Sequence, residues 1–370
     1  MATELAFVLI NPRTIERAQT GAILSRLLCH SRLDLTASRM FGPSTDLVAK
    51  TASVIRESFA DGSVSAADLA DYVEREYAPT DAGVRRAILL LFEGEDAIAK
   101  IADVVGVASD AGGATVRGTF GHDGEPAVIA ASTAAEAKAL LAPWGAAADA
   151  EGGILDVAAG VGSEGVETTL MMVKPDSFRG PSLRPGSILE LMAQADLSIV
   201  GINLFHMTVS QALVFYAPVR EVLRKGFGGN AVDIVREALN STLAGPVSED
   251  AIVEAGKVLG PAYGDSRFEN IVEFMAGYRP SELADDDHDK SGTTCLAVIY
   301  RGVDAIAKVR ALLGPTNPED AGPGTVRFDF GSTITINGAH ASDSVENAKS
   351  EIEIIGASDN FVTGLIAKYS

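Results

Sequence analysis

The chain has 370 residues, of which 47% are hydrophobic and 22% charged, so it is long enough for two or three domains and too apolar to be disordered. Its 50 acidic and 30 basic residues give a net charge of −20, which argues against nucleic-acid polymers and anionic membranes as partners. With no apolar run near the ~18 residues of a membrane helix, no basic secretory signal, and two cysteines in no metal or disulfide pattern, we expect a cytoplasmic protein.

The first half of the chain contains two apolar runs that we expect to form strands, Leu5–Ile10 and Ile88–Phe92. The stretch 146–166 that follows this half is rich in Ala and Gly and has few large side chains, which is typical of a linker. It divides the chain into a predicted first domain, 1–145, and a predicted second domain, 167–370.

The second half alternates strand-like and helix-like segments. We expect strands at Thr168–Val173, Ser198–Met207, Thr293–Tyr300 and Thr325 to about Ile336. We expect helices at Gly186–Ala195, from Ser210 onward, at Val303–Leu313 and at Ser344–Ile354. This order, a doubled βαβ pattern, is typical of the ferredoxin-like (split βαβ) sandwich, an α+β fold with a four-stranded antiparallel sheet. We expect its helices to cover one face of the sheet.

The same landmarks occur twice, in the same order. The segment Asp96–Lys100 is repeated unchanged as Asp304–Lys308, and a Thr-Val-Arg triplet follows each copy. Upstream, Gly21–Leu24 matches Gly186–Leu189, and Asn11-Pro12 and Lys174-Pro175 each end a strand-like run. Four ordered matches predict two tandem copies of the sandwich.

The second copy contains an insertion. Pro12 and Pro175 are 163 residues apart, whereas Lys100 and Lys308 are 208 residues apart, so the second copy has ~45 extra residues. The stretch 220–265 contains two helix-like segments, and we assign most of the excess to it.

Polar side chains gather in the second copy where strands and helices end. They are Lys174, Arg310, Thr316, Arg327, Asn337, His340 and Glu351. Taken singly, each has an ordinary explanation, because a lone Lys or Arg is usually a solvated charge and a single His is more often structural than catalytic. Taken together, they favour a site for a small anion.

Three motifs of the second copy resemble those of the nucleoside diphosphate kinase family. Residues 337–348, NGAHASDSVENA, resemble its active-site signature N-x-x-H-x-S-D-S-V-E. Residues 169–176, TLMMVKPD, resemble its first strand and lysine, and residues 313–327, LGPTNPEDAGPGTVR, resemble the loop before its last strand. The resemblance covers about 165–355 without the insertion.

The resemblance implies a kinase that moves the γ-phosphoryl group of a nucleoside triphosphate such as ATP to a nucleoside diphosphate through a phosphohistidine, with ping-pong kinetics. His340 matches the nucleophile, Glu351 the carboxylate that orients it, and Ser342 a supporting hydroxyl. Mg²⁺ would arrive with the nucleotide, bound by phosphates and water rather than by a protein metal site.

The resemblance also implies the ligands of the nucleotide. Arg310, Thr316 and Arg327 match groups that bind its phosphates, and Lys174 and Asn337 match groups at the ribose, one of which also orients the phosphate.

Two aromatic residues have weaker matches. Tyr216 corresponds to a tyrosine beside the histidine, and its alternative role is a partly buried helix aromatic. Phe268 is the nearest candidate for the ring that stacks on the base, and its alternative role is a core ring. The insertion lies in the helical segment that closes over the base in this family, so base preference stays open.

The first copy lacks most of these groups. By sequence spacing, the counterparts of Lys174, Arg310, Thr316, Asn337 and His340 are Asn11, Ala102, Ala108, Ala127 and Ala130. Arg117, the counterpart of Arg327, is retained. We therefore expect a first copy that folds, lacks histidine transfer and has a structural role.

Members of the family form dimers that build hexamers or tetramers, so the resemblance implies a homo-oligomer. One tandem chain would supply an internal pair of copies, and three chains would close a hexamer-like ring. Two alternatives to the kinase remain: a non-catalytic nucleotide-binding or scaffold and regulatory protein of the same fold, and a protein phosphotransferase that uses His340.

Overall fold

The computed structural model describes residues 3–60, 65–106, 113–122, 125–155, 165–226, 228–243, 245, 247–290 and 292–369. The chain divides into two compact units, one formed by Met1–Phe205 with Thr294–Ser370 and the other by His206–Thr293. The first unit contains both predicted copies, and the second contains the stretch 220–265. Every described helix is too short or too polar to cross a lipid bilayer.

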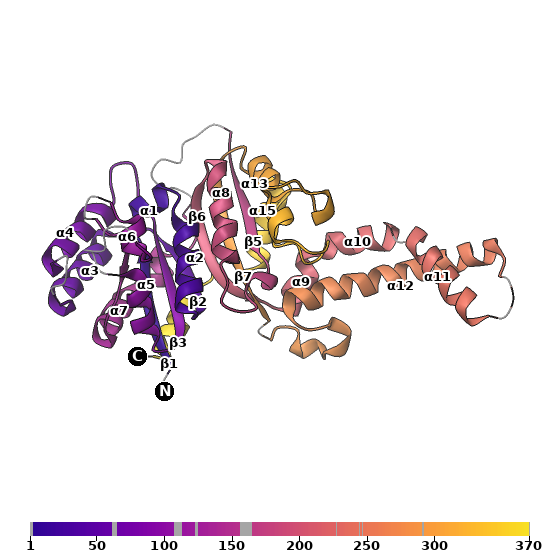
Figure 1. Ribbon diagram of the computed structural model, residues 1–370, viewed down its shortest axis with the longest axis horizontal. Coiled ribbons are helices and arrows are strands. Elements are labelled where there is room, and N and C mark those ends of the chain that lie inside the picture. The colour runs from indigo at the N-terminus through magenta and orange to yellow at the C-terminus, as the bar shows by residue number, and fades with distance from the viewer. Residues whose placement is uncertain are drawn as a thin grey trace. The chain divides into compact units, whose positions relative to one another are not determined.

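The elements of the first copy alternate as the sequence predicts (Figure 1). Its strands are β1 (Thr3–Ile10), β2 (Asp34–Phe41), β3 (Ala87–Glu95) and β4 (Val128–Ala130). Its helices are α1 (Pro12–Glu16), α2 (Thr20–Ser31), α3 (Thr45–Ser58), α4 (Ala66–Tyr77), α5 (Ala97–Val105), α6 (Val116–Phe120) and α7 (Ala134–Glu151).

The second copy follows the same order. Its strands are β5 (Val166–Val173), β6 (Ser198–Met207), β7 (Thr293–Val303) and β8 (Ala339–Ala341). Its helices are α8 (Arg184–Met192), α13 (Ala305–Leu313), α14 (Val326–Phe330), α15 (Val345–Ile354) and α16 (Val362–Ala367). The other unit is helical, with α9 (Val209–Phe215), α10 (Ala217–Gly226), α11 (Gly228–Thr242) and α12 (Glu249–Ala276).

All eight strands belong to one sheet with the order β4-β1-β3-β2-β6-β7-β5-β8. Read from its outer strand, each half has the order fourth, first, third, second, and its registered pairs are antiparallel. This is the split βαβ arrangement, so the predicted fold class is confirmed. The halves meet edge to edge, where Arg39 of β2 pairs with Asn203 of β6.

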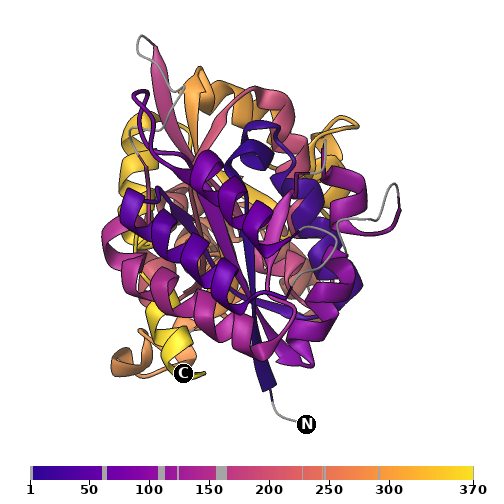
Figure 2. The same ribbon diagram turned by 90° about the vertical axis from the view of Figure 1, so that its left-hand side faces the viewer.

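Helices cover both faces of the sheet, and the expectation of one covered face was wrong. Six consecutive residues of β1, Leu5–Ile10, are buried, although successive side chains point to opposite faces. Phe7 meets Trp144 of α7 with ring centroids 6.3 Å apart, whereas Glu4, on the opposite face, accepts a hydrogen bond from the Ile98 amide of α5. Figure 2 shows helices of the first copy lying across its strands. Uninterrupted apolar strands of this kind require a cover on each side.

The expected fourth strand of the second copy, Thr325 to Ile336, is not a strand. Thr325 instead caps α14, with its side chain accepting from the Phe328 amide, and Thr115 caps α6 in the same way. The Thr-Val-Arg triplets therefore mark helix starts, because a threonine hydroxyl satisfies an amide that the first turn leaves unpaired. The true last strand is β8.

The predicted linker begins later than expected. Helix α7 continues to Glu151, so the first six residues of the stretch 146–166 are helical. Thr133 and Glu136 form a capping box at its start, and the alanine-rich sequence that suggested a linker has high helix propensity. Residues 156–164 lie outside the described residues.

The two copies also pack through equivalent helices. Helices α2 and α8 cross where Gly21 faces Gly186. A Cβ on Gly21 would lie 2.3 Å from the Glu190 amide nitrogen, and a Cβ on Gly186 would lie 2.2 Å from the Ser25 amide nitrogen. The matched sequence positions Gly21 and Gly186 therefore allow the two backbones to touch.

Candidate active site

His340 lies on the outer strand β8 and pairs with Met172 of β5. Its Nε2 is 2.9 Å from Oε2 of Glu351 on α15, and the Ser342 hydroxyl donates to the same oxygen at 2.5 Å. The side chains of His340 and Glu351 are 21% and 15% exposed. The carboxylate thus fixes the ring through Nε2, while part of the imidazole reaches solvent.

Lys174 and Asn337 form the buried side of the same region. Lys174, directly after β5, donates from Nζ to Oδ1 of Asn337 at 2.7 Å and to the Thr335 carbonyl at 3.3 Å. Asn337 in turn donates to the Thr316 carbonyl at 2.9 Å. One buried amide therefore links the lysine to the loop that carries Thr316, whose own side chain is exposed.

The Lys174 ammonium has an unusual environment for a lysine. Burial, followed by the charge of nearby Arg327, lowers the pKa of Lys174 to about 8, although Asp176 acts in the opposite direction. Lys174 is 8% exposed, so it holds its proton less firmly than a surface lysine.

The two arginines approach from neighbouring helices. Arg327 of α14 donates to the Gly314 carbonyl at 2.7 Å and to the Ala339 carbonyl, next to His340, at 3.4 Å. Arg310, in the last turn of α13, is exposed, and its carbonyl accepts from the Gly314 amide. Gly314 therefore contacts both arginines, the backbone of Arg310 through its amide and the guanidinium of Arg327 through its carbonyl.

Sequence reasoning missed an ion pair next to this site. Arg184, at the start of α8, lies 3.0 Å from Oδ2 of Asp176, which is 7% exposed, and also donates to the Phe330 carbonyl at the end of α14. Asp176 lies two residues after Lys174 in the sequence Lys-Pro-Asp. Its place in that motif was the one sequence feature that could have indicated its part in the site.

Tyr216 and Phe268 belong to the helical unit. Tyr216 follows α9 and is 7% exposed, with its ring centroid 4.9 Å from that of Phe215. Phe268 of α12 is 2% exposed, and the Arg220 guanidinium lies 5.4 Å from its ring centroid. Their roles beside the histidine and the base stay predictions, and the burial of Phe268 favours its alternative role as a core ring.

The strand registers correct two counterparts in the first copy. Val173 pairs with Ala339, and its counterpart Ile10 pairs with Val128. His340 therefore corresponds to Ile129, not Ala130, and Asn337 to Pro126, not Ala127. The connection from Arg117 to the strand is one residue shorter than its counterpart in the second copy, which spacing alone did not show. Ala108 lies outside the described residues.

In the first copy, tyrosines surround the position that corresponds to Lys174. Asn11 is completely buried, donates to Oη of Tyr72 at 3.2 Å and accepts from Oη of Tyr77. Counting from the N-caps Thr133 and Ser344, Glu351 corresponds to Leu140, which is also buried. An isoleucine and a leucine thus replace the histidine–glutamate pair, so this half has no equivalent nucleophile.

The described residues contain no group of three or more His, Cys, Asp or Glu side chains placed to hold a metal ion.

Comparison with known proteins gives matches to nucleoside diphosphate kinases. Residues 286–361 match the sequence model described as nucleoside diphosphate kinase. A nucleoside diphosphate kinase of Chlamydia muridarum is 27% identical over 200 residues, or 54% of this chain and 99% of the relative. One from Campylobacter concisus is 48% identical over 91 residues, or 25% of this chain and 56% of that relative. The solved nucleoside diphosphate kinase of Aquifex aeolicus is 26% identical and covers 51% of this chain and 94% of its own, with a TM-score of 0.32.

Proposed function

The C-terminal region of this chain belongs to the nucleoside diphosphate kinase family, and on that premise we propose that it transfers the γ-phosphoryl group of ATP to nucleoside diphosphates through His340. The observation that carries the proposal is the contact of 2.9 Å between His340 Nε2 and Glu351 Oε2. When Nε2–H donates to this carboxylate, the lone pair of the imidazole is on Nδ1, which is then the attacking atom.

In the first half-reaction, Nδ1 forms a bond to the γ-phosphorus while the bond from that phosphorus to the β,γ-bridging oxygen breaks. The nucleoside diphosphate leaves with the electron pair, and His340 carries the phosphoryl group. The Glu351 carboxylate stabilises the positive charge that develops on the ring, because it accepts the Nε2 proton in a charge-assisted hydrogen bond.

In the second half-reaction, a terminal oxygen of another nucleoside diphosphate attacks the phosphorus and the P–Nδ1 bond breaks, which restores the imidazole. Arg310 and Arg327 provide guanidinium groups for the phosphates, and Thr316 a hydroxyl. Lys174 and Asn337 would hold the ribose, and their mutual hydrogen bond preorganises both. Ser342 supports Glu351. Tyr216 remains a candidate for a contact with His340, and Phe268 a candidate for stacking on the base.

We assign Mg²⁺ to the substrate. The ion would enter bound to the phosphates of the nucleotide, where it neutralises charge, and the residues of this chain would contact the phosphates rather than the metal.

We further propose that three chains assemble into a ring of six copies. The internal pairing of two copies through β2 and β6 supports this arrangement, because one chain then corresponds to two subunits of a single-copy protein. Light scattering should give a mass three times that of one chain, and a monomeric mass would rule the ring out.

The function is tested by labelling the chain with ATP that carries radioactive γ-phosphate and then adding unlabelled GDP. Wild type should acquire an acid-labile, alkali-stable label and transfer it to GDP, whereas His340→Ala should do neither. His30→Ala, which removes a histidine of the first copy, is the matched control and should behave as wild type. Nucleotide binding by wild type without any label would favour the non-catalytic nucleotide-binding or scaffold alternative.

A further inference from the structure

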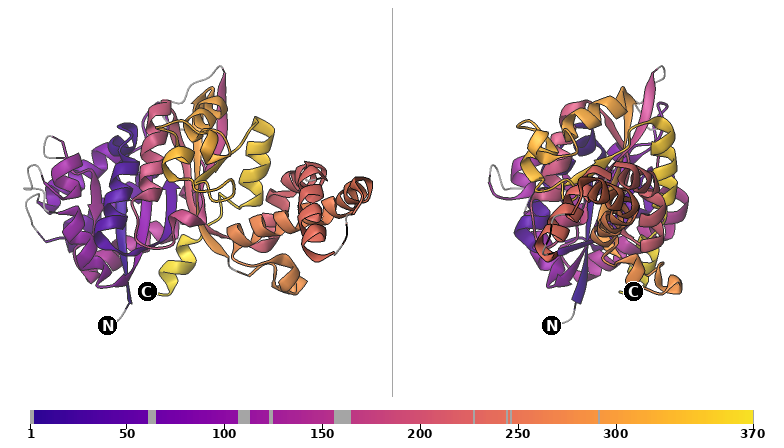
Figure 3. Two further views of the ribbon diagram at one scale, coloured as in Figure 1. Left: turned by 45° about the vertical axis from the view of Figure 1, so that its right-hand side comes forward. Right: turned by 90° about the vertical axis from the view of Figure 1, so that its right-hand side faces the viewer.

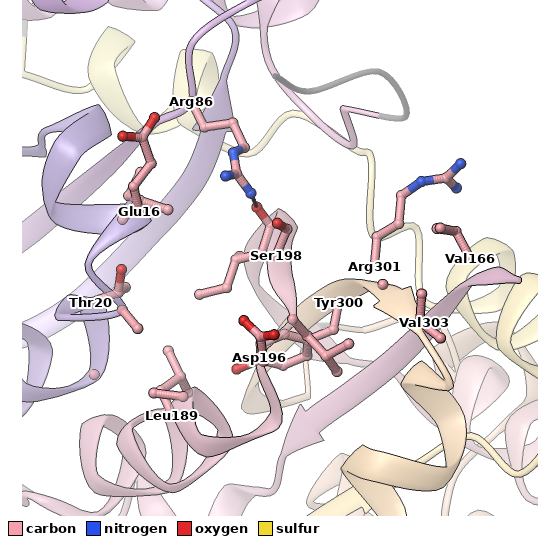
Figure 4. Close-up of a pocket in the computed structure, with 17 residues that line it drawn as sticks. Glu16, Thr20, Arg86, Val166, Leu189, Asp196, Ser198, Tyr300, Arg301 and Val303 are labelled. Carbon is pink, nitrogen blue, oxygen red and sulfur yellow. Dashed lines mark hydrogen bonds between the residues drawn. The ribbon is translucent and has the colours of Figure 1, made fainter. Parts of the chain in front are cut away.

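A cavity of about 350 Å³ lies between the two copies, and none of the site residues described above lines it (Figure 4). One wall comes from the connection between α1 and α2 of the first copy. The opposite wall comes from the start of β6 and the end of β7 in the second copy. Its volume falls at the lower end of the range of small-molecule sites, roughly 300–1,000 Å³.

Arg86, at the junction with β3, reaches into this cavity from the first copy (Figure 4). It is 8% exposed, and it donates to the Ile199 carbonyl at 2.8 Å. Its neighbour Arg85 pairs with Glu16 at 3.2 Å, but no residue that the structure describes forms an ion pair with Arg86. Burial of a cation is costly, and it lowers the pKa of Arg86, while the charge of nearby Glu16 acts in the opposite direction.

The walls contain other polar groups without partners. The residues Thr20 and Tyr300 are each 2% exposed, and their buried hydroxyls have no hydrogen-bond partner among the described residues. Asp196, an exposed residue, places its carboxylate at the cavity on the side opposite Arg86 (Figure 4). Buried polar groups in folded proteins are nearly always satisfied, so the two buried hydroxyls of Thr20 and Tyr300 point to an absent ligand.

We propose that this cavity binds a small hydroxylated organic anion, with its anionic group on Arg86 and its hydroxyl groups on Asp196. A bare inorganic anion could bind Arg86 but would leave Asp196 unmatched. A neutral polyol would leave Arg86 unpaired. An organic anion with several hydroxyls satisfies both ends, because a guanidinium binds carboxylate or phosphate oxygens and a carboxylate accepts from hydroxyls.

The test is a calorimetric titration of the full chain with two probes, ribose 5-phosphate and D-gluconate, which carry a phosphate and a carboxylate beside hydroxyls. Arg86→Met should weaken binding of the effective probe by at least about tenfold, the size expected for a lost hydrogen bond to a charged group. Asp196→Asn should weaken it less, and asparagine tolerates the left-handed φ of 51° at this position.

Arg301→Met is the matched control. The backbone of Arg301 lines the cavity, but its side chain points away, and its guanidinium donates to Thr168 Oγ1 at 2.9 Å (Figure 4). This variant should bind the probe as wild type does. Unchanged kinase activity in Arg86→Met would show that the variant is folded, and if it does not fold, Asp196→Asn carries the test.

Binding of ribose 5-phosphate alone would identify a phosphate ligand, and binding of D-gluconate alone a carboxylate ligand, and either supports the proposal. If neither probe binds, or if binding persists in both Arg86→Met and Asp196→Asn, the proposal is overturned. Persistence in both variants would place the probe elsewhere, for example at the nucleotide site.

Discussion

The imidazole of His340 is oriented by a single carboxylate, and the charge of that carboxylate matters as much as its position. Glu351 holds Nε2 at 2.9 Å, while Ser342 donates to the same oxygen at 2.5 Å. A glutamine at this position keeps the shape but removes the charge that stabilises a cationic ring. The proposed chemistry therefore depends on a carboxylate that acts through the ring of His340.

Glu351→Gln should lower kcat by about 10- to 100-fold, the equivalent of one charge-assisted hydrogen bond. KM for ATP should stay near the wild-type value, because the phosphate and ribose ligands are intact. Glu353→Gln, an exposed glutamate on the same helix, is the control in steady-state kinetics. A wild-type kcat in Glu351→Gln would contradict the role of the carboxylate.

The pH dependence of nucleotide binding should report on Lys174. Its pKa is lowered to about 8, so the ammonium is present below that pH and is lost as pH rises through it. KM for ATP should therefore rise between about pH 7 and 9, well before an ordinary lysine titrates near ~10.4. Lys174→Arg should flatten this profile, since arginine stays charged throughout, and an equally steep rise in that variant would assign it to another group.

At the scale of the elements, the C-terminal segment joins the two copies. It follows α15, the helix that carries Glu351, and α16 then packs against α7 and β2 of the first copy (Figure 3). Arg39 of β2 donates to the carbonyls of Ser358 at 3.1 Å and Asp359 at 2.7 Å. The first copy, which lacks counterparts of His340 and Glu351, thus anchors the end of the second copy.

Arg39→Met should destabilise the unit by about 2–4 kcal/mol, because it leaves buried carbonyls without donors. Arg39 is 2% exposed and also binds the Ala148 carbonyl, so water cannot easily replace it. Urea unfolding is the measurement, with the exposed Arg17→Met as its control. Equal unfolding midpoints for the two variants would show that the anchor contributes little.

The elements also show what the sequence could predict. Long apolar runs such as Leu5–Ile10 predicted their strands, because nothing competed with that pattern. Thr325-Val326-Arg327 was misassigned because β-branched residues favour strands, whereas the threonine hydroxyl acts here as a helix cap. The one-residue difference that makes Ile129 the counterpart of His340 depends on loop length and strand pairing, which sequence spacing does not contain.

At the scale of the whole unit, the motifs named most residues of the candidate site, but the pairing of the copies was visible only in the structure. Lys174 comes from one segment and contacts Asn337 of another, and Arg327 contacts the carbonyl next to His340, while the roles of these residues stay predictions. The edge-to-edge sheet and the contact between α2 and α8 depend on the shapes of the two surfaces. In the sequence, Gly21 and Gly186 show only that they occupy equivalent positions of the two copies, not that they contact each other.

Gly21→Ala should destabilise the chain by about 1–3 kcal/mol, the usual cost of overpacking, because its Cβ would meet the backbone of α8. Gly180→Ala is a suitable control, since a Cβ there meets nothing within 4 Å. Thermal unfolding should separate the two variants clearly. If they unfold at the same temperature, the crossing of α2 and α8 is looser than described.

The central claim is that one fold occurs twice and only the second copy carries out phosphoryl transfer. The most direct test is to label the chain with γ-phosphate from ATP, digest it under alkaline conditions and locate the phosphate by mass spectrometry and ³¹P NMR. We predict a single phosphate per chain, on Nδ1 of His340, and none on peptides of the first copy. Phosphate on another residue, or on Nε2 of His340, would contradict the account.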